Sequence, residues 1–488
     1  MQMQTRHYFI SNSEPAAAHT IGVLLEGARD QTLDFCGETL RFDRQAIAIA
    51  LDGCENITIE NAVIDWDIPF SAEGTILTAS PEAVTVAIDP EKYPHHVEDG
   101  TLVFTGPGWM SRYFGAIEFD KEGRVRAGAG DTFPPVTAAL TASGVELRGA
   151  FSVVPQVGNT LVLRHGVRSH PGFFCQNSQN ITLRNVTFHA TCGLGALFQF
   201  CENITVQHVS FVPGPGRRVL SGHDDGLHFS NCRGQILVED CRFQGLMDDP
   251  INVHGTSVQV LSHSGGLVQG RFGHPQSIGF ATWAAPGDQL SVLDCRTLNS
   301  LGTAVVKSFS LSDPVHFTLE LDRPLPAGVD LALENITNTP RLLCRRNFFG
   351  SCRARGLLVT TPRTVVIEDN TFESSGSAIL LSGDANAWYE SGACRDVTIR
   401  RNRFFHCLTS YYQFCEGVIS LCPEIPDQAG SSGFHENIAI TDNLFDCPGV
   451  PALYAHCARQ IRFSQNTLAD GSDLRQAVKT QYCTIALD

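Results

Sequence analysis

A short phrase of alternating apolar and polar residues recurs along this sequence and restricts the architectures that the chain can adopt. Its copies are CENITIENAVIDW (54–66), SQNITLRNVTFHA (178–190), CENITVQHVSFVP (201–213), RGQILVEDCRFQG (233–245), PRTVVIEDNTFES (362–374), CRDVTIRRNRFFH (394–406), HENIAITDNLFDC (435–447) and ARQIRFSQNTLAD (458–470). Two start-to-start steps recur: one of 23, as from 178 to 201, and one of 32, as from 201 to 233. Periods of this length are typical of solenoids, in which each repeat stacks on its neighbours.

Each copy has the pattern of a strand, a turn and a second strand. In residues 181–188, Ile-Thr-Leu-Arg alternates apolar with polar side chains, and Asn185 then precedes Val-Thr-Phe. A leucine-rich repeat would need a regular leucine frame with a helical half, and an α-solenoid would need helical periodicity; neither pattern is present. The sequence therefore predicts an all-β fold, a right-handed parallel β-helix whose rungs stack ~4.8 Å apart.

Two segments interrupt the repeat, at about 67–165 and 257–336. Both contain hairpin-like runs, GTILTASPEAVTVAID in the first and VKSFSLSDPVHFTLELD in the second. They also carry similar phrases, GNTLVLRH (158–165) and GDQLSVLD (287–294). We interpret them as two related small β-barrel domains inserted into a solenoid, which then comprises residues 1–66, 166–256 and 337–488.

The charge balance indicates which partners the chain can bind. Lys and Arg total 35 against 51 Asp and Glu, a formal net charge of -16, which repels phosphate backbones and makes nucleic acid an unexpected partner. A neutral sugar fits this balance better than a strongly acidic polymer. No run approaches the ~20 apolar residues of a membrane span. An elongated solenoid with projecting barrels also offers surface for a homodimer.

The first residues and the cysteines bear on the cellular compartment. The start, MQMQTRHYFISNSEP, lacks the apolar core of a secretory signal, so we expect a cytoplasmic protein, or a secreted or periplasmic one if a leader was removed. The 17 cysteines are odd in number, and many lie inside strand-like runs. Free thiols buried as small apolar side chains are therefore expected.

The stretch HDDGLHFSNCRGQILVEDCRFQGLMDDPINVHGTS (223–257) concentrates carboxylates at the spacing of the repeat. The step from Asp225 to Asp248 is 23 and the step to Asp249 is 24, which predicts that the three carboxyls meet on adjacent rungs. Like charges in one place raise the pKa of one carboxyl and leave another ionised, which supplies a general acid and a general base together. We therefore predict that these three aspartates are catalytic.

Two further expectations concern the geometry of this stretch. Because neighbouring strand residues face opposite ways, Asp248 and Asp249 can act together only if the backbone bends, and Pro250 favours such a bend. By the same alternation, Asp224 should point away from Asp225 and be structural. Most Asp-Asp pairs are solvated turns, but the spacing of one rung favours function here.

Other polar side chains near these aspartates are candidate sugar ligands. His228, Asn252 and His254 belong to the same stretch, while GDANAWYESG (383–392) and CRARGLLVTT (352–361) add an aromatic ring and charged groups. The complete set of predicted substrate-binding residues is His228, Asn252, His254, Arg355, Asp384, Trp388 and Glu390. Arg353 shares a strand face with Arg355 and is expected to pair with a carboxylate.

No metal or cofactor is expected. The candidate region has no EF-hand-like spacing and no His-x-x-x-His pair, which leaves calcium as the open alternative. Asp, His and Asn are common cation ligands, so this expectation rests on spacing rather than on residue type.

The motifs DDGLHFSNCRG, MDDPINVHG and GDANAWYESG, in this order on a β-helix, resemble glycoside hydrolase family 110, the exo-α-1,3-galactosidases. The likeness covers essentially the whole chain, including the two barrels. It implies removal of terminal α-1,3-linked galactose from blood-group B and related glycans, with inversion and without a metal. It further implies that Asp248 is the general acid, and that Asp225 and Asp249 position and deprotonate the attacking water.

Other functions are compatible with a β-helix of this kind. A polygalacturonase-like hydrolase acting on another sugar would need an Arg-x-Lys cluster for a uronic-acid carboxylate, which the candidate segments lack. A polysaccharide lyase would need a neutralising cation or a prominent base. A non-catalytic carbohydrate-binding solenoid would keep its function after Asp248 is exchanged for Asn.

Overall fold

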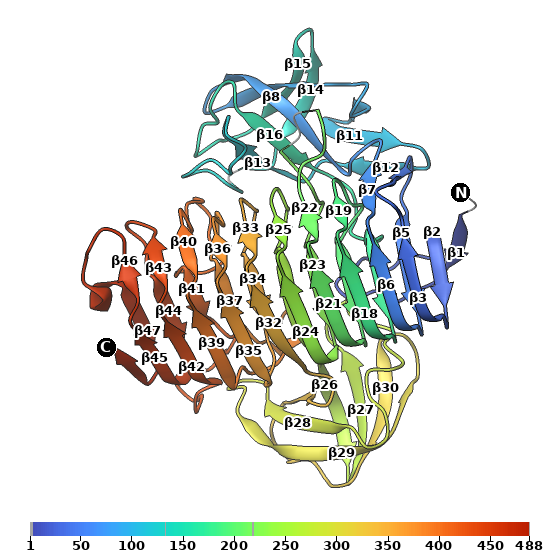
Figure 1. Cartoon of the computed structure of the whole chain (residues 1–488), viewed down its shortest axis with the longest axis vertical. Helices are drawn as coiled ribbons and strands as arrows, with labels where there is room; N and C mark the ends of the chain where they lie inside the picture. The colour runs from blue at the N-terminus through green and yellow to red at the C-terminus, as the bar shows by residue number, and fades with distance from the viewer. Residues whose placement is uncertain (1–2, 132, 217–218, 488) are drawn as a thin grey trace.

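The computed structural model describes residues 3–131, 133–216 and 219–487, and they form a parallel β-helix with two small β domains on opposite sides (Figure 1). The rungs contribute to three parallel sheets that run the length of the solenoid. The fold class predicted from the repeat is confirmed, because equivalent strands of successive rungs pair in parallel and both inserted segments form antiparallel β domains.

The strands of the solenoid are grouped by sheet. The first sheet contains β1 (Gln4–Arg6), β2 (His19–Glu26), β5 (Ile47–Asp52), β17 (Phe173–Gln176), β20 (Ala196–Gln199), β23 (Leu227–Ser230), β26 (Ile251–Ser264), β34 (Leu357–Val359), β37 (Ile379–Leu381), β41 (Ile419–Leu421), β44 (Leu453–His456) and β47 (Val478–Gln481). The second contains β3 (Arg29–Asp34), β6 (Glu55–Glu60), β18 (Gln179–Arg184), β21 (Glu202–Gln207), β24 (Arg233–Glu239), β32 (Pro340–Arg345), β35 (Thr364–Glu368), β39 (Asp396–Arg400), β42 (His435–Thr441), β45 (Ala458–Ser464) and β48 (Ile485–Leu487). The third contains β4 (Thr39–Phe42), β7 (Val63–Trp66), β19 (Thr187–Phe188), β22 (Ser210–Phe211), β25 (Arg242–Phe243), β33 (Phe348–Phe349), β36 (Thr371–Phe372), β40 (Arg403–Phe405), β43 (Leu444–Asp446) and β46 (Thr467–Leu468).

The inserted domains are antiparallel. The first is built from β8 (Ser71–Ala79), β9 (Ala83–Ile88), β10 (His95–Glu98), β11 (Thr101–Gly106), β12 (Trp109–Arg112), β13 (Gly115–Phe119), β14 (Thr137–Thr141), β15 (Gly144–Arg148) and β16 (Thr160–Arg164). The second uses the far half of β26 with β27 (Leu267–Phe272), β28 (Gln289–Asp294), β29 (Ser300–Leu311), β30 (His316–Leu321) and β31 (Leu331–Asn335). The short strand β38 (Glu390–Ser391) pairs with β26, and a 3-10 turn, η1 (Leu474–Ala477), lies near the C-terminus.

The register of the sheets equals the spacing of the sequence repeat. Ile181 pairs with Ile204, and Ile204 pairs with Ile236, so the steps of 23 and 32 seen in the sequence recur as strand pairings. The turn between the second and third sheets uses a left-handed residue in rung after rung, with φ between 52° and 58° at Asn61, Asn185, His208, Asp240, Arg346, Asp369, Arg401, Asp442 and Gln465. Asn and Asp tolerate this conformation best, so they predominate in the repeated phrase.

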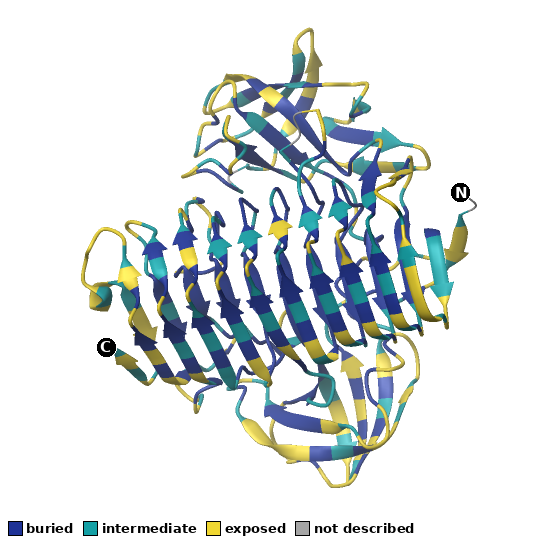
Figure 2. Ribbon diagram, in the orientation of Figure 1, coloured by how far each residue is buried: buried dark blue, intermediate teal, exposed yellow. Residues whose placement is uncertain are grey.

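Equivalent side chains stack inside the solenoid as ladders. Ring centroids lie 4.4–5.8 Å apart along Phe188, Phe211, Phe243, Phe349, Phe372, Phe404 and Phe445. A buried amide ladder joins Asn347, Asn370, Asn402, Asn443 and Asn466. All 17 cysteines are free in the structure, and most are buried. The solenoid is thus a continuous buried core between strands whose outer residues are more exposed (Figure 2).

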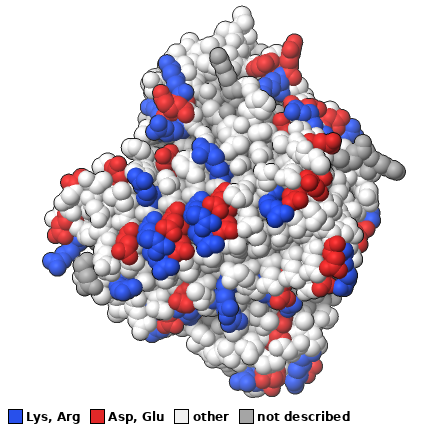
Figure 3. Space-filling model, in the orientation of Figure 1, with Lys and Arg blue, Asp and Glu red and all other residues white. Residues whose placement is uncertain are grey.

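The outer face of the second sheet carries opposite charges on neighbouring rungs. Arg345 contacts Glu239 at 2.7 Å, and Arg400 contacts Glu368 at 2.7 Å, so blue and red side chains adjoin there (Figure 3). The glutamates are largely covered while the arginines are partly exposed, and within each pair the opposite charges neutralise one another. Among the described residues, no helix has the length and apolar character needed to cross a membrane.

Candidate active site

The catalytic candidates lie at two equivalent corners, where the chain turns into the first sheet. His223–Gly226 precedes β23 and Met247–Pro250 precedes β26, and each corner follows a bridge residue, Gly222 or Leu246. The predicted backbone bend at Asp248 and Asp249 is therefore present. Gly226 allows the close stacking of these corners, because an added Cβ would lie 2.7 Å from the carbonyl oxygen of Pro250.

The register at these corners corrects one expectation. His228 pairs with Asn252, a step of 24, so Asp225 lies over Asp249 and Asp224 over Asp248. The prediction that a step of 23 places Asp225 directly over Asp248 is wrong. The rung between them has 24 residues, one more than the rungs that begin at 178 and 435. Asp225, Asp248 and Asp249 still line one cavity.

Arg168 contacts both Asp224 and Asp248, which stack on neighbouring rungs. Its Nη2 lies 3.0 Å from Asp224 and 2.8 Å from Asp248. His223 Nδ1 also contacts Asp224 at 2.6 Å, so Asp224 is enclosed by partners and does not line the cavity. Asp224 thus holds Arg168 in place, in keeping with its expected structural role.

Asp225 is hydrogen-bonded to a pair of buried histidines. Its Oδ2 lies 2.7 Å from His228 Nδ1, and His228 Nε2 lies 2.8 Å from His254 Nε2. His254 Nδ1 lies 2.7 Å from the carbonyl oxygen of Gly255 and must donate its proton there, since a carbonyl only accepts. Burial lowers the pKa of His228 well below its usual value, so this imidazole carries a single N–H. When His228 donates that N–H to His254 Nε2, its Nδ1 can only accept, which fits a protonated Asp225 carboxyl.

Asp249 is paired with Arg355 from the next rung. The Arg355 backbone N–H donates to Asp249 Oδ1 at 2.8 Å, and Arg355 Nη2 lies 2.8 Å from Asp249 Oδ2. Arg355 is in register with Asp249, because Ile251 pairs with Leu357. One column of the solenoid therefore holds Asp225, Asp249 and Arg355 in succession.

These surroundings divide the charge among the three carboxyls. Burial and then the neighbouring Asp248 raise the pKa of Asp225 well above its usual value, whereas burial lowers that of His228. Burial raises the pKa of Asp249 to about 7 despite Arg355. Burial alone would raise the pKa of Asp248 too, but nearby arginines, foremost Arg168, lower it. Near neutral pH, Asp248 is ionised and the proton resides on the Asp225–Asp249 side.

The first inserted domain closes one side of the site. Asp131 contacts Arg353 at 2.5 Å and Arg164, at the end of β16, at 3.9 Å. The expectation that Arg353 pairs with a carboxylate is confirmed. Met247, next to Asp248 in the sequence, is buried against this domain in a cluster with Ile117 and others. That packing fixes the corner that carries Asp248.

The opposite side is formed by the loop that carries Trp388. Asp384 accepts backbone N–H groups from residues 386–389, including those of Asn386 at 2.6 Å and Tyr389 at 2.9 Å. Trp388 is 49% exposed and stacks on His274 with a centroid distance of 4.5 Å. Asp384 therefore shapes the loop, and Trp388 presents its ring at the mouth of the cavity.

These groups enclose a cavity of about 370 Å³. Its lining comprises Asn12, Arg164, Arg168, Asp225, Asp248, Asp249, Asn252, Arg353, Arg355, Leu358, Leu380, Ser382, Asp384, Trp388, Glu390, Phe414 and Glu424. Asn252 Oδ1 is buried without a hydrogen-bond partner among the described residues, so it is available to accept from a ligand hydroxyl. Glu390 accepts from Asn12 Nδ2 at 2.6 Å.

The structure brings most predicted ligands to this cavity, but not two of them. His228 and His254 lie behind the lining, 0% and 1% exposed, where they contact Asp225 and each other rather than open space. The sequence alone did not identify Asn12, Arg164, Arg168, Phe414 or Glu424. They come from segments outside the aspartate stretch, and nothing in their local sequence marks them as neighbours of these carboxyls.

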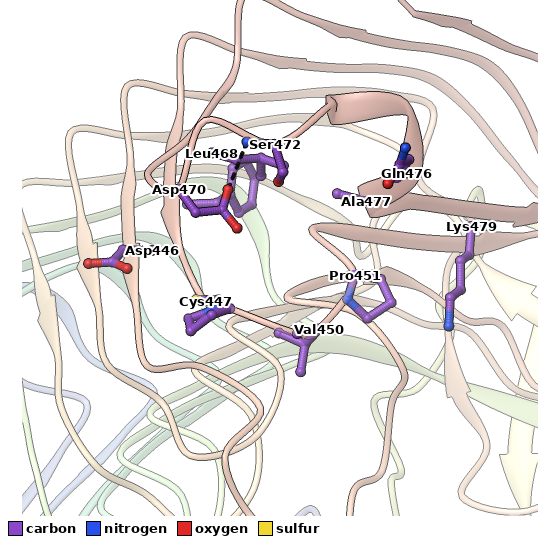
Figure 4. Close-up of a pocket in the computed structure, with 13 residues that line it drawn as sticks. Asp446, Cys447, Val450, Pro451, Leu468, Asp470, Ser472, Gln476, Ala477 and Lys479 are labelled. Carbon is purple, nitrogen blue, oxygen red and sulfur yellow. Dashed lines mark hydrogen bonds between the residues drawn. The ribbon is translucent and has the colours of Figure 1, made fainter.

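Two other observations bear on alternative sites. A separate cavity of about 290 Å³ lies near the C-terminus, and its lining includes Asp446, Val450, Pro451, Asp470 and Lys479 (Figure 4). Among the described residues, it shares no lining residue with the aspartate cavity. In the part of the chain that the structure describes, no three His, Cys, Asp or Glu side chains are grouped to hold a metal ion.

Known family models match the two inserted domains. The family models GLAA-B beta-barrel domain I and domain II match residues 72–161 and 268–331. The A-module of mannuronan C-5 epimerase AlgE6 from Azotobacter vinelandii aligns over 95% of this chain and 79% of its own, at 9% identity and a TM-score of 0.34.

Curated relatives cover nearly the whole chain. Alpha-1,3-galactosidase B of Bacteroides thetaiotaomicron is 40% identical over 95% of this chain and 77% of its own length. Alpha-1,3-galactosidase A of Bacteroides fragilis is 34% identical over 95% of this chain and 78% of its own length. With this similarity and both barrel domains in place, the chain is a glycoside hydrolase of the α-1,3-galactosidase family, glycoside hydrolase family 110.

Proposed function

We propose that this enzyme is an inverting exo-α-galactosidase that removes terminal α-1,3-linked galactose from blood-group B-type or linear α-1,3-galactoside glycans. One observation carries the proposal: three carboxyls share a cavity and hold different charges. The activity named for the relatives supplies the sugar and the linkage.

An inverting hydrolase needs a carboxylic acid to protonate the leaving oxygen and a carboxylate to activate water on the opposite face of the sugar. The cavity supplies both forms at neutral pH. Asp248 is ionised beside Arg168, while burial and mutual repulsion keep a proton on the Asp225–Asp249 side.

The resting charges differ from the roles that the family resemblance implies. The resemblance makes Asp248 the general acid, yet in the resting enzyme Asp248 has the lowered pKa of the three. We follow the resting charges and assign the acid to the Asp225–Asp249 side and the base to Asp248. Activated substrates, which need no acid, distinguish the two assignments.

The cavity suits a neutral terminal sugar. Each of its four arginines already faces an aspartate: Arg164 and Arg353 face Asp131, Arg168 faces Asp248, and Arg355 faces Asp249. A uronic-acid carboxylate would therefore compete with existing ion pairs. Trp388 offers an aromatic face and Asn252 an uncommitted oxygen, which are typical contacts to a sugar ring and its hydroxyls.

Hydrolysis assays test the proposal directly. We expect release of free galactose from blood-group B trisaccharide, from linear α-1,3-galactobiose, or from both, and none from α-1,4 or α-1,6 isomers. Proton NMR during the first minutes should show β-galactose, since inversion produces the opposite anomer. Absence of galactose from both α-1,3 substrates contradicts the activity, and α-galactose as the first product contradicts inversion.

A further inference from the structure

A second cavity adjoins the aspartate cavity on its C-terminal side. It has a volume of about 360 Å³ and shares two lining residues, Phe414 and Glu424, with the first. The guanidinium groups of Arg353 and Arg355 lie 5.3 and 5.2 Å from the centre of the Phe414 ring. These contacts position Phe414 as the wall between two adjoining spaces.

The register of the first sheet places this second cavity in line with the first. Asn252 pairs with Leu358, Leu358 with Leu380, Leu380 with Ser420, and Ser420 with Tyr454. Tyr454 therefore occupies the same outward column as Asn252, two rungs beyond Leu380. Two rungs correspond to ~10 Å along the solenoid axis, a distance that the next sugars of an extended glycan can span.

Other directions from the aspartate cavity are obstructed. On the N-terminal side, residues 8–13 cover the preceding rungs. Ser11 Oγ contacts Ser230 Oγ at 2.8 Å, and the Ser11 backbone N–H donates to Gln199 Oε1 at 3.0 Å. The loop that carries Asp131 lies near the starts of the strands of the first sheet, where it contacts Arg353 ahead of β34. The loop that carries Trp388 lies at the other end of these strands, because it follows β37. The C-terminal rungs therefore offer the path for the rest of a glycan.

The lining of the second cavity fits a neutral sugar. Its described residues include the ring of Tyr454, the exposed edge of Phe414, and two carboxylates, Glu416 and Glu424, but no Lys or Arg. Burial lowers the pKa of His456, so its imidazole is neutral at pH 7. Aromatic faces pack on the apolar faces of pyranose rings and carboxylates accept from their hydroxyls, whereas an anionic sugar would be repelled.

Resting on the function proposed above, we propose that this second cavity binds the neutral sugars that precede the terminal galactose, with Tyr454 as their stacking platform. The glycan then lies along the solenoid axis, with its terminal galactose between Asp225 and Trp388 and its remaining residues beyond Phe414.

Calorimetric binding in an Asp248→Asn background, where turnover is blocked, tests the inference. The ligands are galactose and a trisaccharide that ends in α-1,3-linked galactose. We expect the trisaccharide to bind more tightly, and Tyr454→Ala to weaken its binding about tenfold while leaving galactose binding unchanged. Tyr454→Phe should keep the trisaccharide affinity because it keeps the ring. Tyr411→Ala is the matched control, since Tyr411 is 66% exposed and lines neither cavity.

Two results overturn the inference: equal affinity for galactose and trisaccharide before Tyr454 is changed, or a Tyr454→Ala effect that is absent or equal for both ligands. Hydrolysis of the same trisaccharide by the unmodified enzyme is measured separately. Hydrolysis without the Tyr454 effect contradicts only the second cavity. No hydrolysis together with no galactose binding contradicts the proposed function itself.

Discussion

The corners 223–226 and 247–250 have the same backbone course on neighbouring rungs but different surroundings. At the first corner, His223 contacts the His165 carbonyl oxygen at 2.6 Å and Asp224 at 2.6 Å. At the second, Met247 occupies the equivalent position and packs against the first inserted domain. The same local backbone structure therefore holds Asp224 and Asp225 beside polar groups, whereas the corner of Asp248 and Asp249 is held by apolar packing.

Asp225 and Asp249, which occupy equivalent positions in the two corners, also have different partners. Asp225 is hydrogen-bonded to His228, a neutral side chain, whereas Asp249 is paired with the cationic Arg355. Both carboxyls have raised pKa values because they are buried, while the more accessible Asp248 is ionised beside Arg168. Stacking of the rungs therefore brings the carboxyls together, and residues from other segments decide which carboxyl holds the proton.

The largest expected effect comes from removing the cavity carboxyls. Asp225→Asn, Asp248→Asn and Asp249→Asn should each lower kcat/KM for an α-1,3-galactoside by about 10³-fold, since each removes an acid or a base. Asp224→Asn, at the first corner but outside the cavity, should cost far less. Comparable losses in all four variants would refute the distinction between lining and structural aspartates.

The same variants separate acid from base on α-galactosyl fluoride, whose leaving group needs no protonation. The resting charges predict that Asp248→Asn stays inactive on the fluoride, while Asp225→Asn or Asp249→Asn recovers activity. Fluoride release is measured with an ion-selective electrode. Recovery by Asp248→Asn would instead support the role that the family resemblance implies.

Replacing Arg168, the cation shared by Asp224 and Asp248, should affect both activity and stability. Arg168→Gln leaves Asp224 and Asp248 without their shared partner, so the pKa of Asp248 should rise. We expect about a 10²-fold loss of kcat and a destabilisation of about 3–5 kcal/mol, the usual cost of breaking a buried pair. Denaturant unfolding measures the stability, and Arg323→Gln, in an exposed pair, is the control. An unchanged unfolding midpoint would contradict the pairing.

The histidine pair is expected to affect the alkaline limit of activity through Asp225. A carboxyl with a raised pKa is protonated below that pKa, so kcat/KM should fall as the pH rises through the raised pKa values of Asp225 and Asp249, which for Asp249 is about 7. His228→Phe removes the side chain that accepts from protonated Asp225, so the part of this limb that belongs to Asp225 should move to lower pH, with about a tenfold loss at pH 8.

His316→Gln, at an exposed histidine of the second inserted domain, should leave the pH profile unchanged. A His228→Phe profile that loses amplitude without moving would show that His228 supports the fold only.

The smallest effect is expected at the mouth of the cavity. Trp388→Ala should raise KM about fivefold with little change in kcat, because the ring contacts sugar without touching the reacting atoms. Trp388→Phe should restore most of the affinity. A loss confined to kcat would place Trp388 among the groups that act on the transition state.

Much of the fold could be predicted from local patterns. Alternation in copies such as 181–188, an Asn or Asp before each second strand, and the regular spacing of the copies specify rungs with these turns, because strand period and left-handed turn preference are local properties. The two interruptions of the repeat also mark the inserted domains.

The sequence by itself determined that Asp225, Asp248 and Asp249 would lie near one another, since a rung-length separation in a solenoid is a spatial contact. Only the tertiary structure decided the register that pairs His228 with Asn252, the position of His228 and His254 behind Asp225, and the arrival of Arg168 beside Asp248. Register depends on the length of a single rung, and charge depends on neighbours contributed by distant segments. A pKa is therefore a property of the assembled site, which no local pattern contains.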